Sequence, residues 1–198
     1  MNNELKLVFA TQNTGKYYEV KKMMPSNISV LSLGDLSFKG DIKETGKTLK
    51  QNAKIKSDYI FKHFKIDCFA DDTGLEIESL NGMPGVYSAR FAGENCNSQD
   101  NIEKVWELLA GSKNTKARFK SIFSLNLNGK TSFFEGKIDG KIIFEQKGQN
   151  GFGYDSIFVP NGYSKTFSEL TLTQKNRISH RSKALKRLII FLDKQKYL

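Results

Sequence analysis

The stretch KLVFATQNTGKYYEVKKMM, residues 6–24, decides the fold class of this 198-residue chain. Residues 6–10 form an apolar run that is typical of a buried strand, and the polar, glycine-containing residues 11–15 predict a turn. Residues 16–24 are then expected to form a helix that ends before Pro25. A buried strand followed directly by a helix is the repeating unit of α/β proteins, so this stretch predicts an α/β fold.

The first half of the chain continues this alternation. A second strand is expected over 28–33, and an amphipathic helix over 44–64, with Glu44 in its first turn. Residues 66–70 predict a strand that ends in an acidic turn over 71–74, and a further strand is expected over 75–80.

The second half is richer in β-structure. A helix is predicted over 98–109, followed by an alternating strand over 119–127 and a hairpin turn at Asn128-Gly129. Further strands are expected over 131–138, 142–145 and 156–159, and a last helix over 176–193. The whole pattern favours an α/β fold around a mixed sheet.

Composition limits the possible organisation and location. At 38% hydrophobic residues, the chain predicts one domain over 1–198, either compact or with one core split into two lobes. The two cysteines, Cys68 and Cys96, are too few for a disulfide framework, and we find neither a signal peptide nor a membrane-spanning stretch. We therefore expect a cytoplasmic protein that does not bind membranes.

The formal net charge of +10 suggests an anionic partner. A basic nucleic-acid-binding protein is one alternative, but it predicts basic and aromatic residues concentrated together. The lysines here are instead spread along the chain, so we expect no stable nucleic-acid complex.

The first candidate cluster follows the first strand. Backbone amides at a helix start favour phosphate oxygens, and a lysine adds a cation. A capped strand-to-helix turn is the alternative reading. The cluster consists of Thr11, Gln12, Asn13, Thr14, Gly15 and Lys16.

The second cluster is acidic and comprises Asp71 and Asp72, with Glu44 earlier in the chain. Adjacent carboxylates repel each other unless a cation joins them or water solvates them. Mg²⁺ takes one or two carboxylates and completes its shell with waters and substrate phosphates, so it is the natural candidate. A solvated surface turn is the alternative.

The third and fourth clusters lie in the last quarter of the chain. In the segment 150–155, glycines beside aromatic residues suit a purine base, although the aromatic rings could instead anchor the loop to the core. The fourth cluster offers donors that suit a keto oxygen or a phosphate, and it consists of Lys175, Asn176, Arg177, Ser179, His180 and Arg181. A basic helix start is the alternative, but the helix dipole disfavours it. The GxSxG sequence of a serine hydrolase is absent, so Ser179 and His180 do not indicate that class of enzyme.

Together the clusters resemble one family, the non-canonical purine NTP pyrophosphatases, also called inosine triphosphate pyrophosphatases or RdgB-like proteins. The matching stretches are VFATQNTGKYYEV (8–20), ETGKTLKQNAKIK (44–56), FADDTGLEIESLNGMPGVYSARFAG (69–93), GQNGFGYDSIFVP (148–160) and SHRSKAL (179–185). The third stretch is a very specific signature. A Maf-like pyrophosphatase that acts on other modified nucleotides is the closest rival.

The resemblance implies an elongated central mixed sheet flanked by helices, two lobes around a substrate cleft, and a homodimer. It implies hydrolysis of ITP, dITP and XTP to the monophosphate and pyrophosphate, with Mg²⁺ held by Glu44 and Asp72. Asp72 would also be the catalytic proton acceptor. Substrate would be bound by Thr11, Gln12, Asn13, Thr14, Gly15, Lys16, Thr73, Phe152, Gly153, Tyr154, Asp155, Lys175, His180 and Arg181.

Overall fold

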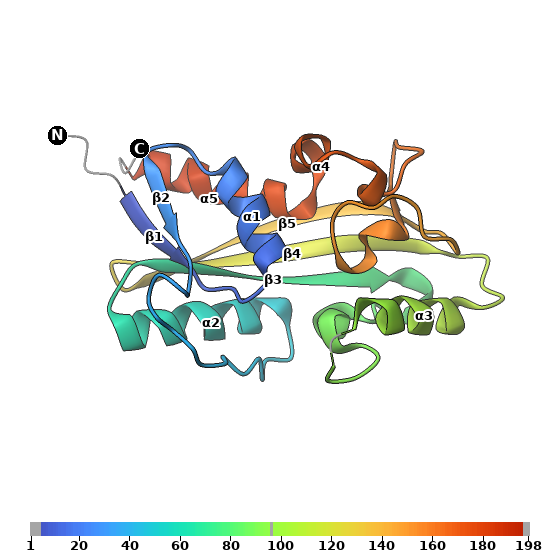
Figure 1. Ribbon diagram of the computed structural model, residues 1–198, viewed down its shortest axis with the longest axis horizontal. Helices are drawn as coiled ribbons and strands as arrows, with labels where there is room; N and C mark the ends of the chain where they lie inside the picture. Colours follow the sequence, from blue (N-terminus) through green and yellow to red (C-terminus); the bar gives the residue numbers. More distant parts are fainter. Residues whose placement is uncertain (1–4, 96, 196–198) are drawn as a thin grey trace. The chain divides into compact units, whose positions relative to one another are not determined.

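The computed structural model describes residues 5–95 and 97–195, and it has the expected α/β class. Within these residues the strands are β1 (Leu5–Phe9), β2 (Ile28–Leu31), β3 (Cys68–Ile77), β4 (Lys116–Leu127), β5 (Lys130–Ile142) and β6 (Phe158–Pro160). The α-helices are α1 (Thr14–Met23), α2 (Leu49–Phe64), α3 (Ser98–Leu109), α4 (Leu172–Ile178) and α5 (His180–Lys194) (Figure 1).

The described strands form one mixed sheet in the order β2-β1-β3-β4-β5-β6. β1 pairs in parallel with β2 and β3, whereas β5 pairs antiparallel with β6. The predicted Asn128-Gly129 turn joins β4 to β5, and both of its residues have positive φ, as a two-residue hairpin turn requires. The mixed sheet predicted from the sequence is therefore confirmed.

The chain divides into two compact units. Unit 1 contains the residues up to Asp72, the segment Ser121–Gly136 and the residues from Arg181 onward. Unit 2 contains Thr73–Lys120 and Lys137–His180. The chain passes from one unit to the other between Asp72 and Thr73, and again between His180 and Arg181, so the fourth candidate cluster contains residues of both units.

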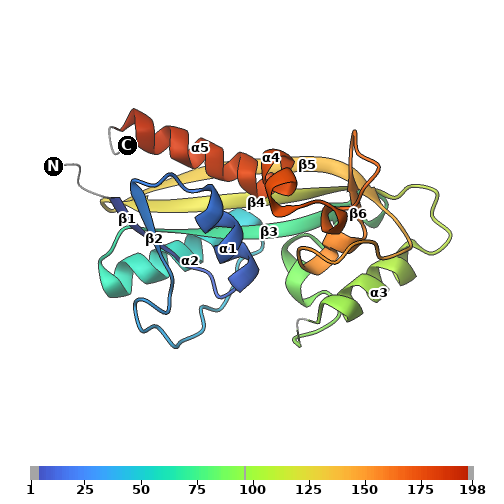
Figure 2. The same ribbon diagram turned by 45° about the horizontal axis from the view of Figure 1, so that its top comes forward.

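In unit 1, α2 covers one face of the strands, and α1 and α5 cover the other (Figures 1 and 2). Because side chains alternate along a strand, Leu7 and Phe9 of β1 pack on the α1/α5 face, while Val8 and Ala10 pack on the α2 face. This explains why the first strand reads as a continuous apolar run. On the α1/α5 face, the rings of Phe9 and Phe69 stack with their centroids 4.7 Å apart.

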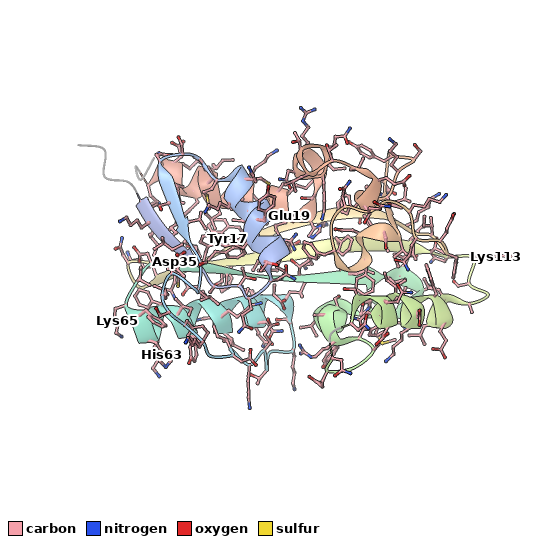
Figure 3. All side chains as sticks on the ribbon, viewed as in Figure 1. Tyr17, Glu19, Asp35, His63, Lys65 and Lys113 are labelled. Atoms are coloured by element: carbon pink, nitrogen blue, oxygen red, sulfur yellow. The ribbon has the colours of Figure 1, made fainter. Side chains whose placement is uncertain are left out.

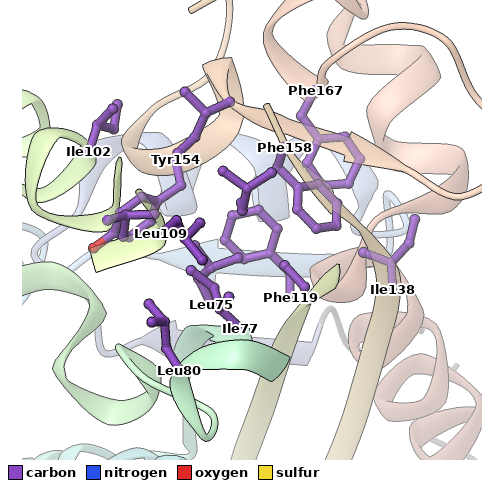
Figure 4. Close-up of a cluster of buried hydrophobic side chains, with 14 of the residues drawn as sticks. Leu75, Ile77, Leu80, Ile102, Leu109, Phe119, Ile138, Tyr154, Phe158 and Phe167 are labelled. Carbon is purple, nitrogen blue, oxygen red and sulfur yellow. The ribbon is translucent and has the colours of Figure 1, made fainter. Parts of the chain in front are cut away.

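Unit 2 has its own hydrophobic core, shown in Figure 4. Leu75 and Ile77 project from β3 into this core, where they meet residues of α3, β4 and β5. Phe119 and Phe158 pack edge to face with centroids 4.7 Å apart. Each unit therefore buries enough apolar surface to hold its polar site residues in fixed positions.

Two predictions about β-structure were wrong. The expected acidic turn at residues 71–74 lies inside the continuous strand β3, because sheet pairing and buried cations outweigh the local turn preference of Asp and Gly. Likewise, β5 continues to Ile142, so a separate strand over 142–145 does not form.

Two helix predictions were also wrong. The long helix begins at Leu49, capped by Thr48, which leaves Glu44 in the preceding loop instead of the first helical turn. The single last helix is two helices, because Ser179 has an extended backbone (φ −65°, ψ 157°) that ends α4 before α5 starts at His180. Within the described residues, no helix is long and apolar enough to cross a membrane.

Candidate functional site

The acidic pair of β3 is the centre of the site in unit 1. Asp71 and Asp72 are both buried, but they are consecutive in a strand and so project to opposite faces of the sheet. Asp71 follows the alternation of Phe69 onto the α1/α5 face, and Asp72 follows Ala70 onto the α2 face. The strand therefore separates two carboxylates that would otherwise repel each other at close range.

On the α2 face, Lys56 joins the two carboxylates that the sequence assigns to a metal. Its Nζ lies 2.7 Å from Glu44 Oε1 and 3.7 Å from Asp72 Oδ1. Burial by itself would lower the pKa of Lys56, but the carboxylates of Asp72 and Glu44 outweigh it and raise that pKa. Lys56 is therefore charged at neutral pH.

Asp72 is in the opposite situation. Burial raises the pKa of its carboxyl group, while the positive charges of Lys56 and Lys16 lower it in part. A buried carboxylate with a raised pKa is a better proton acceptor than a solvated one, so its environment suits the role of a general base.

On the α1/α5 face, Asp71 binds two cations. Lys16 Nζ lies 3.2 Å from Oδ1, and Arg181 Nε lies 3.4 Å from Oδ2. Arg181, which is 1% exposed, also donates from Nη1 to Glu19. Figure 3 labels Glu19 on α1. Burial lowers the pKa of Lys16, and the charge of Asp71 opposes this effect. These four residues form a network in which two cations balance two carboxylates.

The α2 face, in contrast, carries two carboxylates and one ammonium group, which leaves a net negative charge. Carboxylate oxygens are hard ligands that suit Mg²⁺, so Glu44 and Asp72 fit a divalent cation. No group of three or more His, Cys, Asp or Glu side chains able to hold a metal occurs within the described part of the chain. Two carboxylates match an ion that takes its other ligands from water and substrate.

The turn between β1 and α1 is built largely by its own side chains. Asn13 caps α1 by accepting a hydrogen bond from the N–H of Lys16 at 2.9 Å, and Thr11 Oγ1 accepts one from the N–H of Asn13. Gln12 donates to the carbonyl of Gly40. The helix starts at Thr14, so the turn presents the positive end of α1 together with the side chain of Lys16.

In unit 2, a buried ion pair organises the third cluster. Lys175 Nζ lies 2.6 Å from Asp155 Oδ2, which also accepts a hydrogen bond from the N–H of Phe152 at 3.0 Å. The same ammonium group lies 5.1 Å from the centroid of the Phe152 ring and 5.4 Å from that of Phe167. The structure thus brings together three predicted site residues, Phe152, Asp155 and Lys175.

The other predicted residues of unit 2 are placed as follows. Tyr154 is part of the hydrophobic core, and its hydroxyl donates to the carbonyl of Ser88 at 2.9 Å. Burial raises the pKa of this hydroxyl. The His180 ring is buried and stacks on Phe119 with centroids 4.7 Å apart, whereas Thr73 is half-buried in β3 and Gly153 has a φ of 61° at the start of η3 (Gly153–Ser156).

The sequence pattern did not indicate two charged residues of the site, Lys56 and Glu19. Lys56 lies on the buried face of α2, and its spacing from Asn52 and Ile60 could have revealed a lysine at a core-facing position. Glu19 lies likewise on the buried face of α1 beside Val20. A charged residue at an apolar helical position predicts a buried partner, although it does not say which one.

Comparison with known proteins gives a consistent result. The model of the Ham1 family matches residues 7–191. A protein of Christiangramia forsetii named dITP/XTP pyrophosphatase is 50% identical over 190 residues, which cover 96% of this chain and 100% of the relative. A protein of Bacillus subtilis with the same name is 43% identical over 190 residues, covering 94% and 96% of the two chains.

Solved structures agree with this relationship. The Ham1 protein of Staphylococcus aureus superposes with a TM-score of 0.87 at 38% identity, covering 96% of this chain and 99% of the other. A HAM1 protein of Coxiella burnetii gives a TM-score of 0.88 at 37% identity, with the same coverage. The likeness therefore extends over nearly the whole length of each chain.

Proposed function

The chain belongs to the Ham1 family, and from this premise we propose that it hydrolyses dITP, XTP and ITP to the nucleoside monophosphate and pyrophosphate. It is a nucleoside triphosphate pyrophosphatase, a hydrolase of nucleotide metabolism that removes these purine nucleotides from the pool. One observation carries the proposal: the carboxylates of Glu44 and Asp72 are gathered around the buried ammonium group of Lys56. This combination suits a metal-bound polyphosphate.

We propose Mg²⁺ as the cofactor, held by Glu44 and Asp72. The net negative charge and hard oxygen donors of this face support the assignment. When bound, the ion neutralises negative charge on the phosphate oxygens.

The reaction we propose is in-line attack of water on the α-phosphorus. Asp72 accepts the proton of the attacking water, whose oxygen forms the new bond to phosphorus. The bond from the α-phosphorus to the oxygen that bridges it to the β-phosphorus breaks, and this oxygen leaves with pyrophosphate. Lys16 and Lys56 stabilise the charge of the leaving group. The turn 11–16 contributes amide donors at the start of α1.

We propose that unit 2 binds the base and sugar. Phe152 stacks on the purine, and Asp155 keeps Lys175 in place beside that ring. The other residues proposed to bind the base and sugar are Thr73, Gly153 and Tyr154. The hydrogen bond of Tyr154 fixes its loop to the core.

Discrimination between bases would depend on ring position 6. Inosine and xanthosine present a keto acceptor there, whereas adenine presents an amino donor. His180 and Arg181 would donate to the keto oxygen, and Asp71 and Glu19 hold the guanidinium group in one orientation. Adenine would leave these donors without an acceptor, a mismatch that such a site can penalise by up to about 10⁴-fold.

We further propose that both units act as one pyrophosphatase domain, because the family match includes residues of both.

We propose a homodimer, supported by the exposed apolar side chains of Met83 and Tyr87 in one segment of unit 2. A cytoplasmic location is proposed because the nucleotide pool is there. Light scattering would test the dimer.

The activity is tested with a panel of nucleotides at saturating Mg²⁺. We expect dITP, XTP and ITP to be hydrolysed at least about 10²-fold more efficiently than ATP, with pyrophosphate and the monophosphate as products. Release of orthophosphate and a diphosphate would contradict the proposal. A preference for modified pyrimidine nucleotides would support a Maf-like enzyme instead.

A further inference from the structure

We propose that Asn52 is an additional substrate-binding residue, whose Nδ2 donates a hydrogen bond to an oxygen of the triphosphate chain. Asn52 lies in the first turns of α2 and is 0% exposed. The inference rests on the proposed function, because it names a further contact of the same substrate in unit 1.

The orientation of the Asn52 carboxamide is fixed by Gly46. The N–H of Gly46 can only donate, and it lies 2.8 Å from Oδ1 of Asn52. The oxygen end of the amide is therefore assigned by its partner, and Nδ2 must point elsewhere. Gly46 also packs tightly here, since a Cβ at this position would lie 2.5 Å from the same Oδ1.

The nitrogen end of the carboxamide has no such partner. Nδ2 is buried and makes no hydrogen bond with any of the described residues. Buried side-chain donors are nearly always satisfied, so an unsatisfied one that is held rigidly indicates a partner still to be bound. An amide N–H₂ group requires an acceptor, which excludes a metal cation as that partner.

The surroundings identify the class of acceptor. Asn52 and Lys56 are four residues apart in α2, so their side chains project from the same helical face. Lys56 contacts Glu44 and Asp72, and the Gly46–Asn52 hydrogen bond holds the loop that carries Glu44. We therefore place the phosphates on this face of α2, beside the ammonium group of Lys56. Phosphate oxygens are strong acceptors for amide donors.

Three substitutions separate the possible roles. Asn52→Asp keeps an acceptor for the N–H of Gly46 but removes the donor. Asn52→Leu has a similar volume, is neutral and removes both. Gln51→Glu is the matched control for charge, because Gln51 also accepts a loop hydrogen bond, from the N–H of Lys47 at 2.7 Å, and lies exposed one residue away.

The primary measurement is calorimetric binding of inorganic tripolyphosphate, with Mg²⁺ and with a chelator. Loss of one hydrogen bond to a charged oxygen should weaken binding by about 10-fold or more in both Asn52→Asp and Asn52→Leu. Gln51→Glu should bind tripolyphosphate as the unchanged protein does. Thermal unfolding of each variant checks that it is folded, and the aspartate variant keeps the test possible if the leucine variant does not fold.

Other outcomes would overturn the proposal. Unchanged binding in Asn52→Asp, with loss only in Asn52→Leu, would mean that Asn52 merely clamps the loop. Equal losses in Asn52→Asp and Gln51→Glu, with none in Asn52→Leu, would mean that added charge alone is responsible. If the unchanged protein binds tripolyphosphate but hydrolyses no nucleotide of the panel, the proposed function fails while the binding test of Asn52 still stands.

Discussion

Asp72 is the single residue on which the proposed reaction depends most. We expect Asp72→Asn to lower kcat for dITP by at least about 10²-fold, because an amide neither accepts the proton nor carries the charge that a metal ligand needs. Steady-state kinetics at saturating Mg²⁺ measure this loss. The fold should persist, since burial already disfavours the charged form of this side chain.

Asp139→Asn is the matched control for the Asp72 variant. Asp139 forms an exposed ion pair with Arg118, 2.9 Å from its Nε, and such pairs contribute little to stability. This variant should keep the full rate. Near-normal turnover in Asp72→Asn would exclude Asp72 as the proton acceptor.

A test of Arg181 requires a substitution that keeps its positive charge, which alanine does not. Removing its guanidinium group would leave the buried carboxylates of Asp71 and Glu19 without this cation, which costs about 3–5 kcal/mol in comparable cases. Arg181→Lys keeps a cation but loses the planar fork of donors. We expect the ratio of kcat/KM for ITP to that for ATP to fall by about 10-fold or more in this variant.

The nucleotide ratio separates two roles of Arg181. If the residue acts on the phosphates, which both nucleotides share, the two kcat/KM values should fall by the same factor. If it reads the base, ITP should lose most of its advantage while the low ATP rate changes little. The Tm of Arg181→Lys, measured by thermal unfolding, checks that the variant is folded.

At the scale of the element, the turn before η3 depends on Gly151. This residue has a φ of 79°, and a Cβ here would lie 2.2 Å from Oδ2 of Asp155, the atom that binds Lys175. We expect Gly151→Ala to displace that carboxylate and to raise KM for ITP by about 10-fold, the effect of one lost charge-assisted hydrogen bond. Initial-rate kinetics with ITP measure it.

Gly162→Ala separates backbone strain from displacement of the ion pair. Gly162 has a similar φ of 83°, but a Cβ there meets nothing within 4 Å. Both variants should lose some stability, because alanine disfavours positive φ. Equal KM values in the two variants would show that Asp155 is not disturbed.

The elements also show how far the sequence predicts this fold. Strong periodicity and clear end signals predicted the helix Ser98–Leu109 and the hairpin at Asn128-Gly129 correctly. The prediction of an acidic turn at residues 71–74 was wrong because the cations that allow Asp71 to lie inside a strand come from α1 and α5. Local sequence does not contain that information.

The site was predictable to a similar extent. The residue types near Asp72 and Phe152 indicated metal and base chemistry, and the structure gathers several of them as expected. The pairing of Lys56 with Glu44 joins the middle of a helix to a loop, and no spacing rule connects those two positions. Contacts set by tertiary packing therefore account for most of what was missed.

At the scale of the whole molecule, three strands, β3, β4 and β5, run through both units. We therefore expect one cooperative unfolding transition. Leu188 is fully buried in the core of unit 1, so Leu188→Ala should cost about 2–5 kcal/mol and lower Tm by about 5–15 °C. Trp106, the one tryptophan in the sequence, belongs to unit 2 and reports on that unit by fluorescence.

Fluorescence and circular dichroism should give the same lowered midpoint in Leu188→Ala. Ile190→Ala is the control on the same helix, because Ile190 is 53% exposed and should change stability by less than about 0.5 kcal/mol. A Trp106 transition that stays at its original temperature, while the dichroism signal splits, would show independent units.

The division into units has a consequence for inheritance and engineering. Neither unit is a continuous stretch of the gene, since unit 2 is made of two segments and the residues of unit 1 flank both of them. A truncation, a duplication or a single recombination event within residues 73–180 always cuts through at least one unit. To exchange unit 2 with that of a relative, a chimera must be joined at four places. We therefore expect the specificity of this protein to be altered more readily by substitution than by exchange of a whole unit.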